Sequence, residues 1–358
     1  MSEKKEAIII LTPGFPENEV DSNCLPERQT FVKALKKVNP HLTIIILSFQ
    51  YPFSKKHYLW NGIDVYSFNG RNRPRLSRVM IWVRVWKRMR ILNRKYRIKG
   101  VLSFWLGECA FVGNIFSKRY HLQHYVWLLG QDARPGNKYV SLIKPNPFSL
   151  IAISDFLANE FFKNYLIMPR HVVPTGIDAS LFDVNSEDRN VDILGAGSLI
   201  PLKRFDLFIE IVHELVSNFP DLKVVICGNG PEKESLQLQI NAYNLGKNIK
   251  LASEVPHKDL LKLMQQSRIF LHTSSYEGFA TVITEALYAG AHVICFCKPM
   301  KEPINQLYVV DNKKQMIDKI KELLQQTSPQ ESVFPYSPEI AASYITRLLV
   351  EEKVTNPI

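Results

Sequence analysis

The sequence predicts an α/β protein with two domains, each built on a parallel β-sheet. At 358 residues the chain exceeds one comfortable core and suits two domains of about 150 to 180 residues each. Short apolar runs rich in Ile and Val alternate with helix-period segments nearly from end to end, which is typical of parallel strands joined by crossover helices. Turn-forming and charged residues interrupt this alternation at residues 174–190, where we place a hinge.

The first domain is expected over residues 1–175. Its strands are predicted at residues 7–12, 42–48, 64–68, 99–104, 123–129, 149–152 and 171–173, with helices in the gaps. The first run, Ala7–Leu11, is too short for a signal peptide and is interpreted as a buried strand. No uncharged apolar stretch approaches the roughly 20 residues that span a membrane, so we expect a cytoplasmic protein.

The second domain is expected over residues 176–335, followed by a C-terminal helical segment over residues 336–358. Strands are predicted at 191–196, 222–227, 248–251, 268–272 and 292–296, and helices at 313–326 and about 338–352. Two Rossmann-like halves joined by a hinge leave a crevice where the carboxyl ends of both sheets face each other. Ligands of such sheets bind at those ends, so the chemistry is expected there.

Composition excludes several classes of site. The five cysteines include no Cys-x-x-Cys pair and are interpreted as reduced thiols, with neither zinc nor disulfides. His121 and His124 lack a suitably spaced third ligand, so no metal site is assigned. The formal charge of +11 is unevenly distributed, because residues 71–99 alone hold twelve Lys or Arg and no acid.

The most informative segment runs from Ser274 to Gly290. It opens after a predicted strand with a glycine turn and continues into an apolar-faced helix that ends at a glycine. The first N–H groups of such a helix, near residues 279–282, suit a phosphate. Glu277 precedes the helix and Glu285 lies about two turns inside it, so the two carboxylates suit the opposite ends of one elongated ligand, such as a sugar and a ribose.

Two glutamates in the pattern E-G-F-x-x-x-x-x-E-A-L-x-x-G resemble the donor motif of retaining glycosyltransferases of family 4. The resemblance implies the GT-B fold, with two Rossmann-like domains facing a central cleft and a C-terminal helix that crosses back to the first domain. It also implies that Glu277 contacts the hydroxyls of the transferred sugar and that Glu285 binds the ribose. The amides expected to contact the sugar and diphosphate belong to Gly278, Phe279, Ala280 and Thr281. The alternative for this segment alone is a capped surface helix with two solvated acids.

A second segment, Gly195–Asp206, places a glycine turn and two cations between a predicted strand and helix. It is similar to the family's G-x-L-x-x-x-K segment, which implies donor contacts at Gly197 and Ser198 and a lysine, Lys203, that neutralises the leaving diphosphate. Many family members carry an arginine where this chain has Ser198, and the neighbouring Arg204 is expected to compensate. Taken alone, this pattern also fits a simple turn and a solvated helix start.

Further matches to the family continue along the second half. Val225–Glu232 is similar to the family's strand followed by G-x-G-P, which implies that Gly228 and Gly230 lie beside the nucleotide; a plain strand-to-helix turn explains these glycines equally well. His257 occupies the place where the family's backbone meets the base. Residues 298–303 lack the Gly-Gly of the family's closing loop, which leaves the choice of donor open.

The first half is expected to bind the acceptor. Gly14 and Phe15 follow the first strand, where GT-B enzymes place a loop facing the cleft; a rigid Pro/Gly turn is the alternative. Gln131 or Asp132 lies where relatives often place a histidine that touches the transferred sugar. Glu108 also follows a strand, and it suits equally a role as a helix cap.

The basic segment, residues 71–99, interleaves arginines and lysines with tryptophans and aliphatic residues. A cationic helix of this kind can lie on an anionic lipid surface, which would suit a lipid-linked acceptor. In the alternative, one face packs on the sheet and the arginines are solvated. Base-stacking and RNA-binding motifs are absent from the sequence, so nucleic acid is not expected as a partner.

The resemblance implies a transferase that moves a sugar, with retention of configuration, from a UDP- or GDP-sugar to a glycan or lipid-linked acceptor in cell-surface polysaccharide or glycoconjugate synthesis. It implies no cofactor and no active-site metal. A dinucleotide-dependent oxidoreductase is disfavoured, because no G-x-G-x-x-G follows the first strand. A non-catalytic GT-B module that binds a sugar nucleotide or a partner transferase is the alternative function, favoured by Ser198 and the missing Gly-Gly.

Overall fold

A computed structural model describes residues 4–22, 24–73, 76–183, 188–326 and 331–351. The chain forms two compact units, one from the residues up to Gly176 together with those from Tyr336, and the other from Ile177 to Pro335. Residues 184–187 of the predicted hinge, residues 74–75 of the basic segment and the expected end of the last helix at Glu352 lie outside the described residues.

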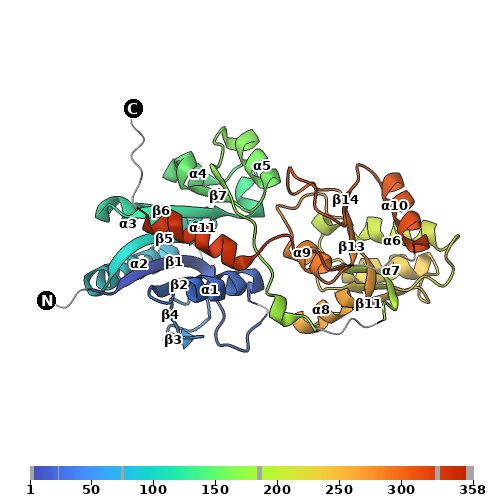
Figure 1. Ribbon diagram of the computed structural model, residues 1–358, viewed down its shortest axis with the longest axis horizontal. Coiled ribbons are helices and arrows are strands. Elements are labelled where there is room, and N and C mark those ends of the chain that lie inside the picture. Colours follow the sequence, from blue (N-terminus) through green and yellow to red (C-terminus); the bar gives the residue numbers. More distant parts are fainter. Residues whose placement is uncertain (1–3, 23, 74–75, 184–187, 327–330, 352–358) are drawn as a thin grey trace. The chain divides into compact units, whose positions relative to one another are not determined.

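The sheet of the first unit has the strand order β3-β4-β2-β1-β5-β6-β7-β8 (Figure 1). Its neighbours pair in parallel except β3 and β4, which pair antiparallel. The strands are β1 Glu6–Gly14, β2 Thr43–Tyr51, β3 His57–Trp60, β4 Ile63–Ser67, β5 Arg97–Phe104, β6 Gln123–Leu128, β7 Leu150–Ala152 and β8 His171–Val172. The antiparallel strand β3 was not among the predicted strands, because it is short and half exposed.

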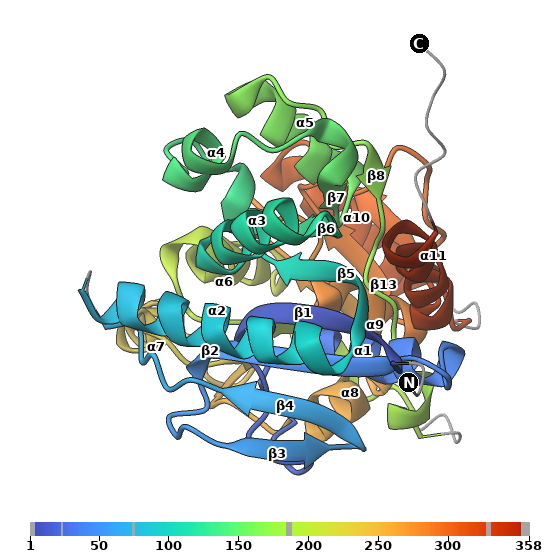
Figure 2. The same ribbon diagram turned by 90° about the vertical axis from the view of Figure 1, so that its left-hand side faces the viewer.

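Helices cover this sheet on both faces. They are α1 Pro26–Val38, α2 Leu76–Lys95, α3 Glu108–Tyr120, α4 Lys138–Ile143, α5 Asp155–Tyr165 and α11 Pro338–Val350, with short 3-10 turns η1 Gly130–Ala133 and η2 Pro147–Ser149. Figure 2 shows α2 and α3 lying along one face of the sheet. Their apolar residues Val85 and Phe116 join Ile9 of β1 in one buried cluster, which holds the helices to the sheet.

The last helix, α11, packs on the first unit, as the sequence resemblance implied. It contacts α1, β5 and β6. Its approach depends on Gly100 of β5, since a Cβ at that position would lie 2.8 Å from the backbone oxygen of Leu349. The side chain of Asn39, at the end of α1, donates to Thr346 Oγ1 at 2.8 Å and adds a polar link. The chain therefore returns to its first unit after the second is complete.

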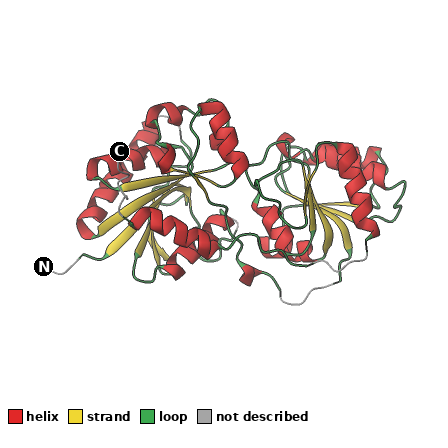
Figure 3. Ribbon diagram, turned by 45° about the horizontal axis from the view of Figure 1, so that its top comes forward, coloured by secondary structure: helices red, strands yellow, loops and turns green. Residues whose placement is uncertain are grey.

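The second unit has a six-stranded, wholly parallel sheet in the order β11-β10-β9-β12-β13-β14. The strands are β9 Val191–Ala196, β10 Val224–Cys227, β11 Ile249–Ala252, β12 Ser267–His272, β13 His292–Cys295 and β14 Leu307–Val309. The helices are α6 Phe205–Leu215, α7 Lys233–Ala242, α8 His257–Gln265, α9 Thr281–Tyr288 and α10 Lys313–Gln325, with 3-10 turns η3 Ala179–Leu181 and η4 Pro201–Lys203. In both units helices surround the strands (Figure 3). Both sheets are thus those of an α/β protein, as predicted.

Candidate functional site

The loop between β12 and α9 is fastened to the 3-10 turn η4. Thr273 Oγ1 donates to the backbone oxygen of Lys203 at 2.9 Å, and the backbone N–H of Ser275 donates to the oxygen of Leu202 at 3.1 Å. These bonds bring two predicted catalytic residues together, since Lys203 Nζ lies 2.5 Å from Glu277 Oε2. A lysine and a glutamate separated by 74 positions in the chain thus form one ion pair at the carboxyl edge of the second sheet.

The Glu277 carboxylate is held in its ionised form. Burial alone raises the pKa of Glu277, but the His272 ring and the Lys203 ammonium outweigh burial, and the pKa falls to about 2. Burial lowers the pKa of His272 in turn, so that its ring is neutral at physiological pH. His272 Nε2 lies 3.6 Å from the same Oε2 atom that Lys203 contacts. The site therefore presents one carboxylate, one cation and one neutral imidazole.

Glu285, the second predicted donor-binding acid, lies within α9 and is largely buried. Its Oε1 atom is 2.8 Å from Nε2 of His257, the first residue of α8. The sequence assigned His257 a backbone contact with the base, whereas the structure shows its side chain paired with Glu285. Helix α9 keeps the two acids on separate parts of the site, because Glu277 precedes its first residue, Thr281, and Glu285 follows it by a little over one turn.

The beginning of α9 offers N–H groups for an anion. The helix starts at Thr281, and no side chain caps it at Ala280. The first N–H groups of a helix have no partners within the helix, and they carry the positive end of its dipole. The side chains of Phe279 and Ala280 are mostly buried, so a ligand at this helix start would meet the backbone and not these two side chains. This arrangement suits the phosphate contacts predicted for these residues.

The glycines Gly228 and Gly230 pack two turns against each other. A Cβ on Gly228 would lie 1.9 Å from the oxygen of Gly197, and one on Gly230 would lie 2.3 Å from the oxygen of Leu199. The N–H of Leu199 also donates to the oxygen of Asn229 at 2.9 Å. Packing therefore requires glycine at both positions and fixes the turn that contains Gly197, and the same packing leaves their predicted place beside the nucleotide a prediction.

Three other predicted donor-side residues lie in that turn or next to it. Gly197 has φ of +152°, a value that side chains disfavour. Ser198 and Arg204 are exposed, and Arg204 adopts φ of +53° just before α6. Their exposure leaves them accessible to a ligand.

His272 was not singled out from the sequence. It is the last residue of β12 and is 4% exposed. The one available signal was a histidine ending an apolar strand shortly before Glu277. Since a strand end gives no indication of whether its side chain turns inward, that signal could not place the ring beside the carboxylate.

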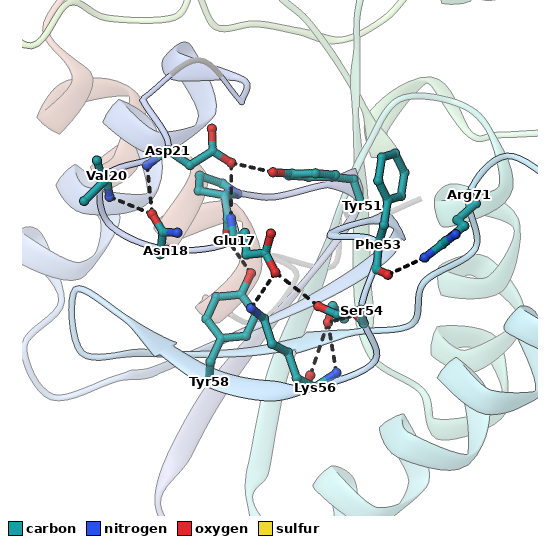
Figure 4. A network of polar contacts seen from close by, with 12 residues as sticks. Glu17, Asn18, Val20, Asp21, Tyr51, Phe53, Ser54, Lys56, Tyr58 and Arg71 are labelled. Carbon is teal, nitrogen blue, oxygen red and sulfur yellow. Dashed lines mark hydrogen bonds and ion pairs between the residues drawn. The ribbon is translucent and has the colours of Figure 1, made fainter.

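In the part of the first unit where the acceptor was predicted to bind, the loop between β1 and α1 is held by a network of polar contacts (Figure 4). The Asp21 carboxylate accepts from Tyr51 Oη at 2.9 Å and from the N–H of Glu17 at 3.3 Å. Glu17 Oε1 accepts from Lys56 Nζ at 2.8 Å. Asn18 Oδ1 accepts from the N–H of Val20 at 2.9 Å. The loop is therefore fastened to the end of β2 and to the segment that joins β2 to β3, while the Val20 side chain stays 88% exposed.

Three of the predicted acceptor-side residues take part in the packing of the first unit. Phe15 is fully buried and packs edge-on against Trp60 with ring centroids 4.9 Å apart, so the prediction that it faces a ligand was wrong for its side chain. Gly14 ends β1 next to it. Glu108, in the first turn of α3, accepts from Trp82 Nε1 at 2.8 Å and also bonds Gln50. Gly107 is the N-cap of α3 and no side chain caps the helix, so Glu108 links α3 to α2 and β2, and the capping role that was the alternative for it was wrong.

Of the pair Gln131 and Asp132, only Gln131 is exposed. Asp132 is 3% exposed, and its Oδ2 accepts from the N–H of Leu129 at 2.9 Å. Burial raises the pKa of Asp132 to about 7, even though backbone amide bonds and the buried Arg28 oppose the shift. Asp132 therefore closes the η1 turn, and Gln131 is the member of the pair that can reach a ligand.

The basic helix α2 buries one face and exposes another. Ile81, Val85, Met89 and Leu92 lie in the core. The outer face carries cations together with Val79, Met80, Val83 and Ile91, each about half exposed. In the part of the chain that the structure describes, no helix is both long enough and apolar enough to cross a membrane.

Comparison with known proteins relates the second part of the chain to a family of transferases. Residues 177–349, which include the second unit and most of α11, match the family model of glycosyl transferases group 1. The chain is 32% identical over 125 residues to a subunit of the human phosphatidylinositol N-acetylglucosaminyltransferase, covering 34% of this chain and 26% of that protein. It is 29% identical over 102 residues to 2-deoxystreptamine N-acetyl-D-glucosaminyltransferase of Niallia circulans, covering 28% and 26%. The matches thus span about a quarter of the length of these relatives.

Solved structures extend the likeness to the whole chain at the level of the fold. Sucrose-phosphate synthase from Thermosynechococcus elongatus gives a TM-score of 0.70 at 13% identity, covering 97% of this chain and 95% of that one. Anabaena HepE in complex with UDP and glucose gives a TM-score of 0.66 at 16% identity, covering 97% and 95%. The two parallel-sheet units are therefore those of the GT-B glycosyltransferase fold.

Proposed function

We propose that the protein transfers a sugar from a nucleotide-diphosphate sugar to a hydroxyl group of a glycan or lipid-linked acceptor. The observation that carries this proposal is the ion pair between Lys203 and Glu277, placed just before the uncapped start of α9, with Glu285 in the same helix. In a single donor, Glu277 suits the sugar, Lys203 and the helix start suit the diphosphate, and Glu285 suits the ribose. The match to a glycosyl transferases group 1 domain supports the same reaction.

In the proposed reaction the bond between the anomeric carbon and the diphosphate breaks. A bond from that carbon to the acceptor oxygen forms, the acceptor hydroxyl loses its proton, and the nucleotide diphosphate leaves. Lys203 and the α9 amides stabilise the charge on the leaving group, with Arg204 beside them. Glu277 orients the sugar and Glu285 holds the ribose. Retention of configuration, by attack on the face that the leaving group occupies, is part of this proposal, as is membership of family 4.

For the donor, we propose a UDP-sugar, with UDP-N-acetylglucosamine as the first candidate. The human and Niallia circulans relatives are both named as N-acetylglucosaminyltransferases. A Streptococcus pneumoniae relative, 26% identical over 216 residues, is named as a UDP-N-acetylglucosamine–peptide N-acetylglucosaminyltransferase subunit. Because residues 298–303 lack the family's glycine pair, GDP-sugars belong in the same test.

A ligand screen followed by a transfer assay tests the function. Thermal unfolding is measured with UDP, GDP, ADP and their sugars, since a ligand at a hundred times its dissociation constant stabilises the protein by about 2.7 kcal/mol. Transfer of labelled sugar from the stabilising donor to a lipid or glycan fraction then shows catalysis. Stabilisation without transfer to any fraction would favour the non-catalytic module, and no stabilisation by any nucleotide would contradict both functions. Activity in the presence of a chelator checks the proposal that no metal is needed.

We also propose that the protein works on the cytoplasmic face of a membrane, where α2 contacts anionic lipid while the site acts on a lipid-linked acceptor. The exposed face of α2 supports this, because it combines the cations Arg84, Lys87 and Arg90 with half-exposed Val79 and Val83. A place in the synthesis of cell-surface polysaccharide or glycoconjugate is consistent with such an acceptor.

A further inference from the structure

His272 is a buried polar side chain whose Nε2 atom lacks a hydrogen-bond partner among the described residues. The residue is 4% exposed at the end of β12, and Nε2 has no hydrogen-bond partner among the residues that the structure describes. Its neighbour in that direction is Glu277 Oε2 at 3.6 Å, which is too far for a hydrogen bond. Buried polar atoms are rarely left in this state, so the arrangement calls for an explanation.

The His272 ring lies beside the ring of Phe270, and its Nε2 atom faces the Glu277 carboxylate. It lies nearly parallel to the ring of Phe270, at an interplanar angle of 17° and with centroids 6.3 Å apart. The Glu277 oxygen that Nε2 faces is already held by Lys203 Nζ at 2.5 Å. Oε2 of Glu277 therefore has two possible hydrogen-bond donors. The Lys203 ammonium is within bonding distance, and the His272 imidazole is not.

A bound sugar nucleotide would change which of these two groups contacts the Glu277 carboxylate. If Lys203 neutralises the diphosphate as proposed, its ammonium turns toward the phosphate oxygens and weakens its bond to Glu277. The carboxylate would then be a mostly buried charge without its cation, which is costly. A movement of less than about 1 Å would bring Oε2 within hydrogen-bond distance of His272 Nε2. A neutral imidazole protonated at Nε2 is a suitable donor for this bond.

We propose that His272 is a positioning residue, which donates a hydrogen bond to the Glu277 carboxylate when Lys203 pairs with the diphosphate of the sugar nucleotide. The inference rests on the proposed function and deepens it, since it assigns a role at the same site to a residue that no motif contains. Glu277 then stays ionised and aimed at the sugar hydroxyls during transfer. His272 contacts neither the sugar nor the nucleotide in this scheme, and it acts through Glu277 alone.

A matched pair of substitutions separates the hydrogen bond from simple packing. Glutamine in His272→Gln places an N–H donor about where Nε2 lies, whereas methionine in His272→Met has similar length and no such donor. Dissociation constants are measured for UDP-N-acetylglucosamine and for UDP, which lacks the sugar that Glu277 holds. We expect His272→Met to bind the sugar nucleotide about tenfold more weakly and UDP as the wild type does. His272→Gln should recover most of the lost affinity for the sugar nucleotide. In His272→Met, kcat should fall and KM for the sugar nucleotide should rise.

His213→Met in α6 serves as the control, because its ring stacks on Tyr243 with centroids 4.3 Å apart and has no part in the proposed site. A double-mutant cycle with Glu277→Gln completes the test. In the Glu277→Gln background, His272→Met should cause little further loss of donor affinity. If His272→Met does not fold, His272→Asn replaces it, since its shorter amide cannot reach Oε2.

Two results would overturn the positioning role while leaving the proposed function intact. One is an equal loss of UDP and UDP-N-acetylglucosamine affinity in His272→Met, which would indicate a general packing defect. The other is a full tenfold loss that persists in the Glu277→Gln background. A wild-type protein that binds no nucleotide and no sugar nucleotide would instead overturn the proposed function, and this inference with it.

Discussion

Oε1 of Glu285 and Nε2 of His257 lie 2.8 Å apart, and both side chains are mostly buried. The Glu285 carboxylate is proposed to bind the ribose. A bound sugar nucleotide must therefore share this carboxylate with His257 or displace the His257 side chain from it. We expect Glu285→Ala to raise KM for the donor about tenfold while kcat changes little, because bonds to the ribose are present in both the ground state and the transition state. Steady-state kinetics with varied donor concentration measures this. A fall in kcat at unchanged KM would contradict the ribose role.

Lys203 and Glu277 are expected to matter for turnover itself. Lys203→Ala removes the cation beside the leaving diphosphate, and Glu277→Ala removes the group that orients the sugar. Each should lower kcat/KM about a hundredfold or more, the cost of removing one preorganised charge-stabilising group. The transfer assay measures the rates, with His213→Met as a control that leaves the site intact. Wild-type rates in both variants would reject the site.

The fold was predicted more fully than the site, and particular residues show why. Apolar runs such as Ile8–Leu11 and Ile44–Leu47 became central parallel strands, because burial on both faces requires apolar residues at successive positions. Lys203 and Glu277 were chosen because their segments resemble motifs of a known family, and the structure brings the two residues into contact. Phe15 and Asp132 were proposed for the acceptor side because they follow strands, yet both side chains turn inward.

The residues that sequence analysis missed act through partners distant in the chain. Trp82 and Gln50 hold Glu108, and Arg28 of α1 stacks on the rings of Trp127 and Phe104, with its guanidinium 4.6 Å and 4.9 Å from their centroids. Neither pairing has a local pattern, since each joins elements that meet only after the sheet has formed. For Gly228 and Gly230 the sequence left two explanations open, because a glycine required for packing and one required for a ligand give the same sequence.

The low pKa of Glu277 predicts a definite pH dependence of stability. Its pKa is about 2 in the folded protein against an ordinary 4.5, so the ionised form favours folding. This stabilisation is fully present above pH 4.5 and is lost as pH falls from about 4.5 to about 2. A shift of this size corresponds to about 3 kcal/mol as an upper limit.

The free energy of unfolding is measured for the wild type and for Glu277→Gln between pH 7 and pH 2. We expect the wild type to be more stable at neutral pH and the difference to vanish toward the acid end. A constant difference across this range would show that the Glu277 carboxylate is not selectively stabilised in the folded protein.

The loop between β1 and α1 is expected to affect the acceptor and not the donor. Tyr51→Phe removes the bond to Asp21, at a cost of about 1 kcal/mol to the ordered loop conformation. We expect faster limited proteolysis within residues 17–22 and a severalfold higher KM for the acceptor, with unchanged donor affinity. Ser22→Ala, at an exposed position of the same loop, is the matched control. Loss of donor affinity in Tyr51→Phe would place the loop on the donor side instead.

The outer face of α2 provides the last prediction, which concerns membrane binding. Replacing Arg84, Lys87 and Arg90 with glutamine removes three exposed cations. Each cation contributes about 1 kcal/mol near an anionic surface, so the triple variant should bind anionic vesicles about a hundredfold more weakly than the wild type.

Neutralising the exposed lysines at 223, 247 and 250 of the second unit removes the same charge elsewhere and should leave binding nearly unchanged. Flotation with anionic and neutral vesicles measures both variants, and added salt should weaken binding of the wild type because exposed charges are screened. If the two triple variants lose binding equally, net charge and not α2 governs the association. If the wild type floats with neither kind of vesicle, the arginines of α2 are simply solvated, and the acceptor must reach the site without help from this helix.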